Sequence, residues 1–423
     1  MAFIIQKYTE GYGTAGVKEL AIACFSYFYS LLRYRGSTQE LELSKYFHSI
    51  RRYYSSSQMV FLFFRGRSGL FAVLRALGIT NGDEVIVPGF TCIPVPNAVV
   101  FTGGKPVFAD IEQNSVNVSL ATIEPCISKN TKAIIVQHTF GAPVADIDQI
   151  LALCREQGIA LIEDCCHALG ISYNGKLLGT YGDAAFFSTE RSKMISSIYG
   201  GITLANTPHL SQRIAEIVSR EFFPPDKNHI QSLLTEFIAN NLAIWPSLGI
   251  RFPILGYYAS RAMRWKPLND QAALRSIKAD GYDRLLSASQ AAISLSQFRR
   301  LSSILNHRRI LSSYYDREMK RRGYATLKGL NNKPLLRYPF IFHKRDELIQ
   351  ACASEGITLG RWFESCIHPA ACNIEKLGYR KGQCPNAEWL SAHIVNLPTH
   401  PGISLRRARY IIDRVAKRIT GYM

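Results

Sequence analysis

Six short apolar runs, separated by segments with helical periodicity, constrain the fold of this chain more than any other feature of its sequence. Each run has four or five residues and is nearly continuous in apolar side chains instead of alternating with polar ones. Such runs are typical of strands that are buried on both faces of a parallel sheet. The six runs are Val85–Pro88, Pro106–Ala109, Ala133–Gln137, Ala160–Glu163, Ala184–Ser188 and Gly201–Leu204.

Segments between these runs have the periodicity of amphipathic helices. Apolar residues recur at helical spacing in Gly69–Leu77 and in Ile147–Glu156. Strands that alternate with helices in this way predict an α/β fold with a mostly parallel sheet flanked by helices. In such sheets, ligands bind at the carboxyl ends of the strands.

The rhythm of strands and helices divides the chain of 423 residues into four expected parts. Residues 1–59 form an N-terminal helical segment, and residues 60–204 form the large α/β domain. Residues 205–280, rich in aromatic and basic side chains, are interpreted as an insertion. Residues 281–423 begin with one long helix and end in a small α+β domain. The long helix is expected at Ser287–Met319, and the elements of the small domain are expected at Leu336–Phe342, Arg345–Glu355 and Leu405–Thr420.

Charge and cysteine usage exclude several classes of protein. The net charge of +18 favours anionic partners, but no nucleic-acid-binding motif accompanies it, so we expect no specific nucleic acid. No two of the ten cysteines form a CxxC pair, so we expect no metal site. The start of the chain does not resemble a secretory signal, which indicates a cytoplasmic protein. No apolar stretch is long enough to predict a membrane span.

Asp164 follows directly after one of the buried strands, where a ligand of such a sheet would bind. Pyridoxal phosphate (PLP) needs an anion beside its pyridine nitrogen, which keeps that nitrogen protonated. A carboxylate at this position suits that task. An aspartate that only caps the next helix is the alternative.

Ser188 and Lys193 follow the next buried strand, five residues apart. A lysine amine that leaves a buried strand can attack a carbonyl carbon, and a serine hydroxyl can bind a phosphate oxygen. The segment 64–70, FRGRSGL, adds two glycines at the start of a helix, where backbone N–H groups favour an anion. Alone, each feature also fits an ordinary loop, but together with Asp164 they indicate a phosphate-bearing carbonyl cofactor.

The ordered set of motifs resembles the DegT-like (DegT/StrS) family of PLP-dependent nucleotide-sugar aminotransferases. The resemblance covers residues 60–204 and 281–423. It is carried by GITNGDEVIVPGFT (78–91), GGKPVFADI (103–111), TKAIIVQHTFGAP (131–143), IEDCCHALG (162–170), GDAAFFSTERSK (182–193), ASQAAISLSQ (288–297) and NLPTHPGIS (396–404).

The resemblance implies the aminotransferase fold (fold type I) and a role for each matching residue. Lys193 would hold PLP as a Schiff base, Asp164 would pair with the pyridine nitrogen, and His167 would lie beside the ring. Ser188 and the turn Gly66–Arg67–Ser68 would bind the cofactor phosphate. A homodimer is also implied, in which the segment around Asp283 reaches the partner's cofactor.

Three positions depart from the family pattern. Cys92 stands where members commonly carry an aromatic residue against the cofactor, and Asp283 stands where many carry an asparagine that reaches a phosphate. An acid there repels phosphate unless a cation compensates. The phosphate turn has Arg67 in place of the usual threonine, which would supply such a cation.

The activity that the resemblance implies is transfer of an amino group from an amino acid, often glutamate, to a keto-sugar. The sugar would be nucleotide- or lipid-linked and belong to polysaccharide, glycolipid or secondary-metabolite biosynthesis. One alternative is a sugar dehydratase-like enzyme, although that branch of the family has histidine in place of Lys193. Another is a PLP-binding regulator or membrane-associated protein without catalysis.

Two apolar stripes suggest contact with an anionic membrane at its inner face. One follows Val17, Leu20, Ala21, Cys24, Phe28, Leu31 and Leu32, with Arg33 and Arg35 next to it. The other follows Ile230, Leu233, Leu234, Phe237, Ile238, Leu242 and Trp245, and precedes the mixed aromatic and basic residues Arg251, Phe252, Tyr257, Tyr258, Arg261, Arg264, Trp265 and Lys266. Helices of this kind lie in the headgroup region of a bilayer. Packing of both stripes against the protein itself is the alternative.

Overall fold

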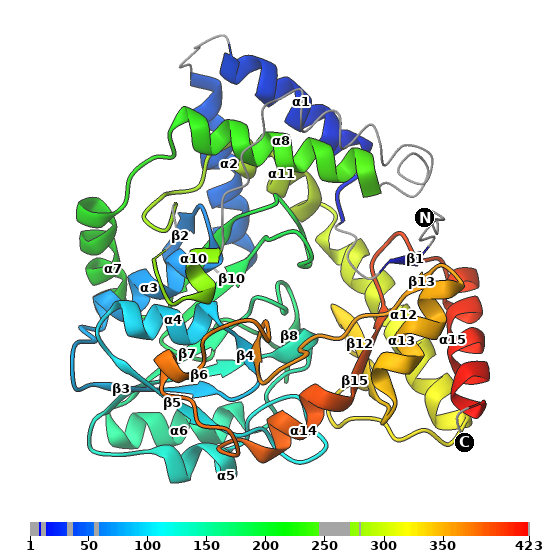
Figure 1. Ribbon diagram of the computed structural model, residues 1–423. Coiled ribbons are helices and arrows are strands. Elements are labelled where there is room, and N and C mark those ends of the chain that lie inside the picture. Colours follow the sequence, from blue (N-terminus) through cyan, green and yellow to red (C-terminus); the bar gives the residue numbers. More distant parts are fainter. Residues whose placement is uncertain are drawn as a thin grey trace.

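The computed structural model describes residues 8–9, 14–31, 37–54, 59–244, 271–278 and 281–421. Its centre is a seven-stranded sheet in the order β2-β11-β10-β7-β6-β3-β5 (Figure 1). Only β11 runs against the other strands, since it is antiparallel to both β10 and β2. The strands are β2 (Met59–Phe63), β3 (Glu84–Pro88), β5 (Lys105–Ala109), β6 (Thr131–Gln137), β7 (Ala160–Asp164), β10 (Ala184–Ser188) and β11 (Gly201–Ala205).

The predicted mostly parallel α/β sheet is therefore confirmed, and all six predicted strands agree within two residues at each end. The sequence analysis did not include β2, which lies at the edge of the sheet. All five residues of β2 are apolar, but only Val60 and Phe63 are buried. The run MVFLF therefore carries the same sequence signal as the other six strands, and the prediction overlooked it.

Side chains of the central strands alternate between two hydrophobic cores, one on each face of the sheet. In β3, Val85 and Val87 join one core, and Ile86 joins the other. The first face is covered by α3 (Gly66–Ala76) and α4 (Pro94–Phe101), and its core continues into the C-terminal domain. The second face is covered by α2 (Ser37–Tyr54) and α6 (Ile147–Gln157). Burial on both faces explains why these strands are apolar throughout.

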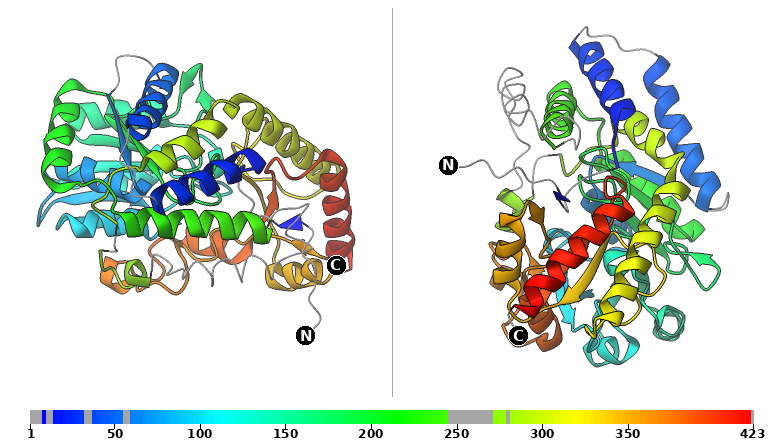
Figure 2. Two further views of the ribbon diagram at one scale, coloured as in Figure 1. Left: turned by 90° about the horizontal axis from the view of Figure 1, so that it is seen from above. Right: turned by 90° about the vertical axis from the view of Figure 1, so that its right-hand side faces the viewer.

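Residues 208–244 form two helices, α7 (Pro208–Glu221) and α8 (Lys227–Ile244). Helix α7 packs against α3, next to the large domain (Figure 1). Helix α8 lies beside α1 (Val17–Leu31), as both views in Figure 2 show. Their facing side chains form a small core with α11 (Ala288–Phe298). The core includes Leu20, Ala23, Cys24, Ile230, Leu233, Leu234, Phe237, Ile238 and Ile293.

This packing buries much of the two apolar stripes that were predicted to contact a membrane, because the central residues of one stripe face those of the other. Val17 and Phe28 do not join this contact and are 62% and 64% exposed. Residues 32–36 and 245–270, which hold the basic and aromatic remainder of both stripes, lie outside the described residues. Among the described helices, none combines the length and apolar character needed to cross a bilayer.

The single helix predicted at Ser287–Met319 is wrong. The structure has two helices there, α11 and α12 (Leu301–Arg321), separated at Arg299 and Arg300. Arg300 has φ −112° and ψ 18°, outside the helical region, although neither glycine nor proline marks the break. Apolar periodicity continues across it because both helices face the same core, so the sequence pattern contains no sign of the interruption.

The C-terminal domain contains a two-stranded antiparallel sheet of β12 (Arg337–Ile341) and β15 (Ile394–Pro398) with α13 (Arg345–Ser354) and α15 (Leu405–Thr420) packed nearby. A parallel pair of β14 (Ile367–His368) and β4 (Thr91–Cys92) joins it to the large domain. The remaining elements are β1 (Tyr8–Thr9), α5 (Leu120–Ile123), η1 (Glu124–Cys126), η2 (Thr139–Gly141), β8 (Ser172–Tyr173), β9 (Lys176–Leu177), α10 (Gln271–Leu274), β13 (Ile357–Thr358), η3 (Glu375–Leu377) and α14 (Pro385–His393).

Candidate active site

A cavity of about 530 Å³ lies at the carboxyl ends of β6, β7 and β10, where the large and C-terminal domains meet. Its size is within the range of pockets that hold a cofactor or a small ligand. Seven of the residues singled out from the sequence line it: Gly66, Arg67, Cys92, Asp164, His167, Ser188 and Lys193. The other two, Ser68 and Asp283, are not among the lining residues.

The start of α3 lies directly against the end of β10. A Cβ atom added to Gly66 would be 3.0 Å from the Ser188 Cβ and 3.0 Å from the Phe187 carbonyl oxygen. Gly201 on the neighbouring strand allows the same closeness, because its added Cβ would lie 2.5 Å from the Arg65 carbonyl oxygen. The two glycines therefore allow the helix start, Arg67 and the Ser188 hydroxyl to lie together. This donor set suits an anion.

Ser68 is fully buried in the first turn of α3 and does not reach the cavity wall. Its side-chain oxygen has no hydrogen-bond partner within the described residues. Its backbone N–H donates to the Arg65 carbonyl oxygen at 3.2 Å. In this geometry, the side chains of Arg67 and Ser188 are better placed than that of Ser68 to bind a ligand in the cavity.

Lys193 lies on the loop between β10 and β11, and two glutamines of α11 hold that loop through its backbone. Gln297 bonds with both the N–H and the carbonyl of Ser196, at 3.0 and 2.7 Å. Gln290 donates to the Tyr199 carbonyl at 2.9 Å. These contacts explain the ASQAAISLSQ motif in physical terms, because its two glutamines satisfy backbone groups of the buried loop.

Glu236 of α8 holds the same loop through side chains. Its carboxylate accepts a hydrogen bond from the Tyr199 hydroxyl at 2.9 Å and forms an ion pair with Arg191. Glu236 is 3% exposed, so these partners offset the cost of burying its charge. The segment after β11 thus contributes to the position of Lys193, whose amine points into the cavity 5.2 Å from the centre of the Trp362 ring.

Asp164 ends β7 and is 3% exposed. Burial raises the pKa of its carboxyl group, while a hydrogen bond from the Cys166 N–H, at 2.9 Å, and the charge of Lys193 act in the opposite direction. A buried carboxylate with one backbone donor favours a cationic partner. The hydrogen bond from the Cys166 N–H is also the one that a carboxylate capping a turn would accept. It therefore does not distinguish a turn cap from the partner of a pyridine nitrogen.

His167 is held as a flat neutral wall of the cavity. Its Nδ1 accepts the Phe140 N–H at 3.1 Å, which leaves the proton of the neutral ring on Nε2. Phe140 has φ 57°, in the left-handed region, and its ring stacks on His167 at an interplanar angle of 4°. Burial, followed by the charge of Lys193, keeps the pKa of His167 well below its usual range.

Cys92 lies in β4, next to the charged groups of the cavity. Burial raises the pKa of its thiol to about 12, and the nearby charge of Lys193 acts in the opposite direction. The side chain is therefore a neutral thiol at neutral pH and not an activated nucleophile. It offers a small, polarizable surface where relatives commonly have an aromatic ring.

Asp283 lies away from the cavity of its own chain, and its side chain is 43% exposed. Its carboxylate is 3.6 Å from Arg284, and its backbone carbonyl accepts the Phe223 N–H at 2.9 Å. Phe223 is itself 50% exposed. Asp283 thus makes no contact with the cavity of its own chain in the described structure.

The cavity wall also contains residues that were not predicted, among them Gln137, Arg337, Trp362 and His368. Gln137 accepts the Thr91 hydroxyl at 2.7 Å and so ties the end of β6 to β4. Arg337, Trp362 and His368 all come from the C-terminal domain, on three separate segments. Only tertiary packing joins them to Lys193, so no local spacing in the sequence could indicate them.

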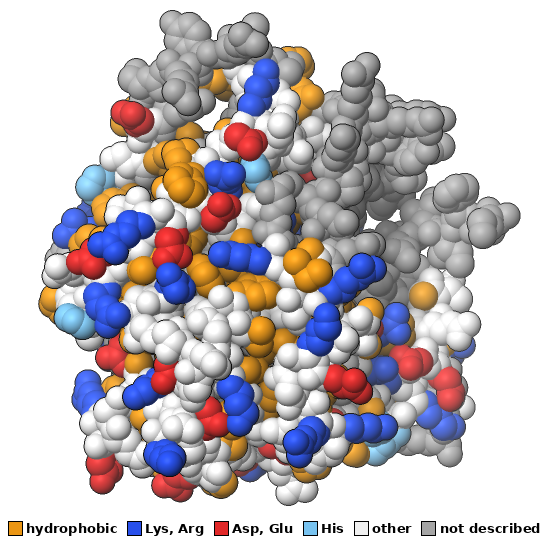
Figure 3. Space-filling model, turned by 60° about the vertical axis from the view of Figure 1, so that its left-hand side comes forward, with side chains coloured by type: hydrophobic (Ala, Val, Ile, Leu, Met, Phe, Trp, Pro, Cys, Tyr) orange, Lys and Arg blue, Asp and Glu red, His pale blue; other side chains and the backbone are white. Residues whose placement is uncertain are grey.

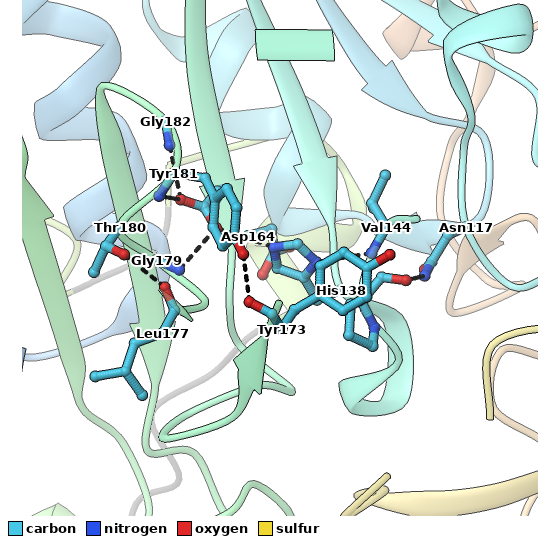
Figure 4. A network of polar contacts seen from close by, with 12 residues as sticks. Asn117, His138, Val144, Asp164, Tyr173, Leu177, Gly179, Thr180, Tyr181 and Gly182 are labelled. Carbon is cyan, nitrogen blue, oxygen red and sulfur yellow. Dashed lines mark hydrogen bonds and ion pairs between the residues drawn. The ribbon is translucent and has the colours of Figure 1, made fainter. Parts of the chain in front are cut away.

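A fully buried network beside the site links His138, Glu163 and the turn before β10 (Figure 4). The Glu163 carboxylate accepts the N–H groups of Gly179, Tyr181 and Gly182 at 2.7–2.9 Å and lies 3.1 Å from His138 Nε2. With Cys165, these side chains are close enough to hold a metal ion. The Glu163 carboxylate already has four hydrogen-bonding partners. We therefore interpret the network as one that stabilises the end of β7.

The residues of the cavity fit PLP in donor chemistry and in size. The buried Asp164 suits a pyridinium, the neutral ring of His167 offers a flat wall, and the turn at Gly66 with Ser188 and Arg67 suits a phosphate. The Lys193 amine shares the cavity with all of these groups. This set defines the class of protein as an aminotransferase-fold enzyme with a lysine-bound cofactor.

The chain belongs to the DegT/DnrJ/EryC1/StrS aminotransferase family, whose pattern matches residues 42–243 and 256–416. It is thus a PLP-dependent aminotransferase. The match includes most of residues 205–280, which the sequence analysis interpreted as an insertion.

Individual proteins are similar to this chain over different lengths. GDP-perosamine synthase of Vibrio cholerae is 44% identical over 142 residues, which span 34% of this chain and 38% of the synthase. A pleiotropic regulatory protein of Geobacillus stearothermophilus is 26% identical over 83% of this chain and 82% of its own length. The solved structure of PseC from Helicobacter pylori, an aminotransferase involved in pseudoaminic acid biosynthesis, covers 98% of this chain and all of its own, with a TM-score of 0.73 and 19% identity.

Proposed function

We propose that this chain transfers the amino group of glutamate to the ketone of a nucleotide- or lipid-linked sugar in the biosynthesis of a polysaccharide, glycolipid or secondary metabolite. The observation that carries the proposal is the meeting of Lys193, Asp164 and the Gly66–Ser188 contact around one cavity. PLP, when bound, supplies a carbonyl that takes up the amino group and a ring that stabilises negative charge.

In this proposal, the residues of the chain have separate tasks. Lys193 would hold the cofactor, and its free amine would move a proton at the substrate carbon next to the transferred nitrogen. Asp164 keeps the pyridine nitrogen protonated. Arg67 and Ser188 would bind the phosphate, and His167 would offer a neutral wall beside the ring. Cys92 leaves more room on the open face than an aromatic ring would.

The test separates the two half-reactions. The PLP form of the protein is mixed with single amino acids, and its absorbance is followed; glutamate should convert it to the pyridoxamine form. That form is then mixed with a panel of keto-sugar nucleotides, and the acceptor restores the original spectrum. A protein that binds PLP but is converted by no amino acid would contradict the proposal and favour the cofactor-binding regulator.

We also propose a homodimer in which Asp283 approaches the partner's cofactor phosphate. Supporting this, Asp283 lies away from its own cavity, and the adjacent Phe223 exposes half of its apolar side chain. Light scattering of the wild-type protein should give the mass of two chains. Phe223→Glu should lower the measured mass toward that of one chain. A wild-type monomer with full activity would contradict this proposal.

Contact with an anionic membrane from the cytoplasm is a further part of the proposal. It is supported by the outer side of α1, where Val17, Phe25 and Phe28 are 62%, 72% and 64% exposed. Basic side chains are spread over the face shown in Figure 3, consistent with general attraction to anionic surfaces. Phe25→Ser with Phe28→Ser should reduce sedimentation with anionic liposomes. Wild-type protein that remains in the supernatant would contradict this part.

A further inference from the structure

An N-terminal segment, residues 14–31, packs against the helix that supports the Lys193 loop. The segment precedes the part of the chain that the family pattern matches, which begins at residue 42. It ends in α1, which contacts both α8 and α11 (Figures 1 and 2). Because Gln290 and Gln297 of α11 hold the backbone of the loop, the segment lies directly behind that support.

Thr14 shares an acceptor atom with the Lys193 loop. Its hydroxyl donates a hydrogen bond to Gln297 Oε1, the same atom that accepts the Ser196 N–H at 3.0 Å. Gln297 Nε2 donates to the carbonyls of Ser196 and Ile293 at 2.7 and 3.1 Å. Both acceptor and both donor positions of this amide are therefore occupied, and Thr14 is one of the partners that fix its orientation.

Glu19 anchors the same segment to the break between α11 and α12. Its carboxylate accepts the Ser296 hydroxyl at 2.6 Å and forms an ion pair with Arg300 at 2.9 Å. Arg300 also donates to the Thr14 carbonyl at 2.8 Å. The arginine at which the two helices separate thus joins Glu19 to the backbone of Thr14.

Burial makes these polar contacts costly to break. Thr14 is 5% exposed, Glu19 is 1% exposed and Gln297 is fully buried. A buried polar group that loses its partner keeps the cost of having left water. Apolar packing of α1 against α8 and α11 would stabilise the protein without reaching the loop, whereas the polar contacts converge on the amide that holds Ser196.

We propose that Thr14 is a positioning residue for Lys193. It acts through Gln297 on Ser196, which follows Lys193 by three residues, and Glu19 keeps Thr14 in place through Arg300. The inference rests on the proposed role of Lys193 as the residue that holds the cofactor. It adds an element outside the matched part of the chain, which orders the loop before the cofactor binds and so lowers the cost of binding.

The first measurement is hydrogen exchange of the apoprotein, read by mass spectrometry in peptides that cover residues 189–200. Thr14→Val removes the hydroxyl but keeps the shape of the side chain, so the loop amides should exchange about three- to tenfold faster. Thr14→Ser keeps the hydroxyl and should exchange as the wild type does. An unchanged rate in Thr14→Val would overturn the inference.

Thr102→Val is the matched control, because it removes a hydroxyl of similar burial at the end of α4. Thr102 is 8% exposed, and its hydroxyl donates to the Val99 carbonyl at 2.7 Å, away from the loop. This variant should leave the exchange of residues 189–200 unchanged. If Thr14→Val accelerated exchange equally in peptides of the central sheet, residues 84–109, the effect would be a general loss of stability, and the inference would be overturned.

The second measurement is titration of the apoproteins with PLP. The affinity of Thr14→Val should be about three- to tenfold lower than that of the wild type, and Thr14→Ser should restore it. Thr102→Val should bind PLP as the wild type does. Faster loop exchange in Thr14→Val with an undiminished affinity for PLP would overturn the positioning role.

A second variant covers the case in which Thr14→Val does not fold. Glu19→Gln keeps an oxygen for the Ser296 hydroxyl but loses its charge opposite Arg300, and the same loop peptides should exchange faster. Wild-type exchange in Glu19→Gln would then overturn the inference. Because the exchange experiment contains no cofactor, it is independent of the proposed function. Wild-type protein that borohydride does not label at Lys193 would contradict the role of that lysine, and the exchange result for the loop would stand.

Discussion

Gly66 packs so closely against Ser188 that any side chain at residue 66 would press on the Ser188 Cβ, 3.0 Å from its own Cβ. We expect Gly66→Ala to push the start of α3 away from the end of β10. The affinity for PLP should fall about tenfold or more, because a phosphate would lose part of its donor set. Titration of the apoprotein with PLP measures the effect. Gly421→Ala, whose added Cβ would meet its nearest neighbour at 3.5 Å, should bind as the wild type does.

Asp164→Asn distinguishes charge from capping. An asparagine oxygen can still accept the Cys166 N–H, so the turn should remain intact. Without the negative charge, the pyridine nitrogen is less readily protonated, and turnover should fall on the order of 100-fold or more. Absorbance should show that the cofactor is still bound. A turnover close to that of the wild type would reduce Asp164 to a turn cap.

Glu236 links α8 to the loop that carries Lys193, through Tyr199 and Arg191. Glu236→Gln should lower the free energy of unfolding by about 1–3 kcal/mol, because the ion pair with Arg191 loses its negative charge at a buried site. The affinity for PLP should fall with it. Urea denaturation and cofactor titration measure the two effects. Glu216→Gln, at an exposed site on α7, serves as the control, and an equal loss in both variants would contradict the link.

From the buried imidazole of His368 we predict how the stability of the protein depends on pH. Burial lowers its folded pKa to about 4, below the usual value of 6.5, so the unfolded chain binds a proton first as the pH falls. This contribution is fully present above pH 6.5 and is lost progressively as the pH falls toward 4. Thermal unfolding of the apoprotein should therefore show a decreasing Tm over this window, less steeply in His368→Gln. Parallel curves for both proteins would contradict the assignment.

How much the sequence could predict differed between the sheet and the site. The central strands and α15 were predictable because burial on two faces, or on one helical face, leaves a periodic pattern. The helix break at Arg300 was not predictable, because α11 and α12 pack against the same hydrophobic core on the same side. Lys193 and Asp164 follow strands that end at one edge of the sheet, so their proximity could be expected. Arg337 and Trp362 come from separate segments of the other domain, and only folding makes them neighbours of Lys193.

The most direct test of this account is to reduce the PLP-loaded protein with borohydride and to locate the attached cofactor by peptide mass spectrometry. The account predicts a single modified residue, Lys193, and no stable adduct in Lys193→Ala. Lys176→Ala, which removes a lysine stacked on Tyr181 outside the cavity, should be labelled as fully as the wild type. Full labelling of Lys193→Ala, or an adduct on any other lysine of the wild type, would contradict the central claim.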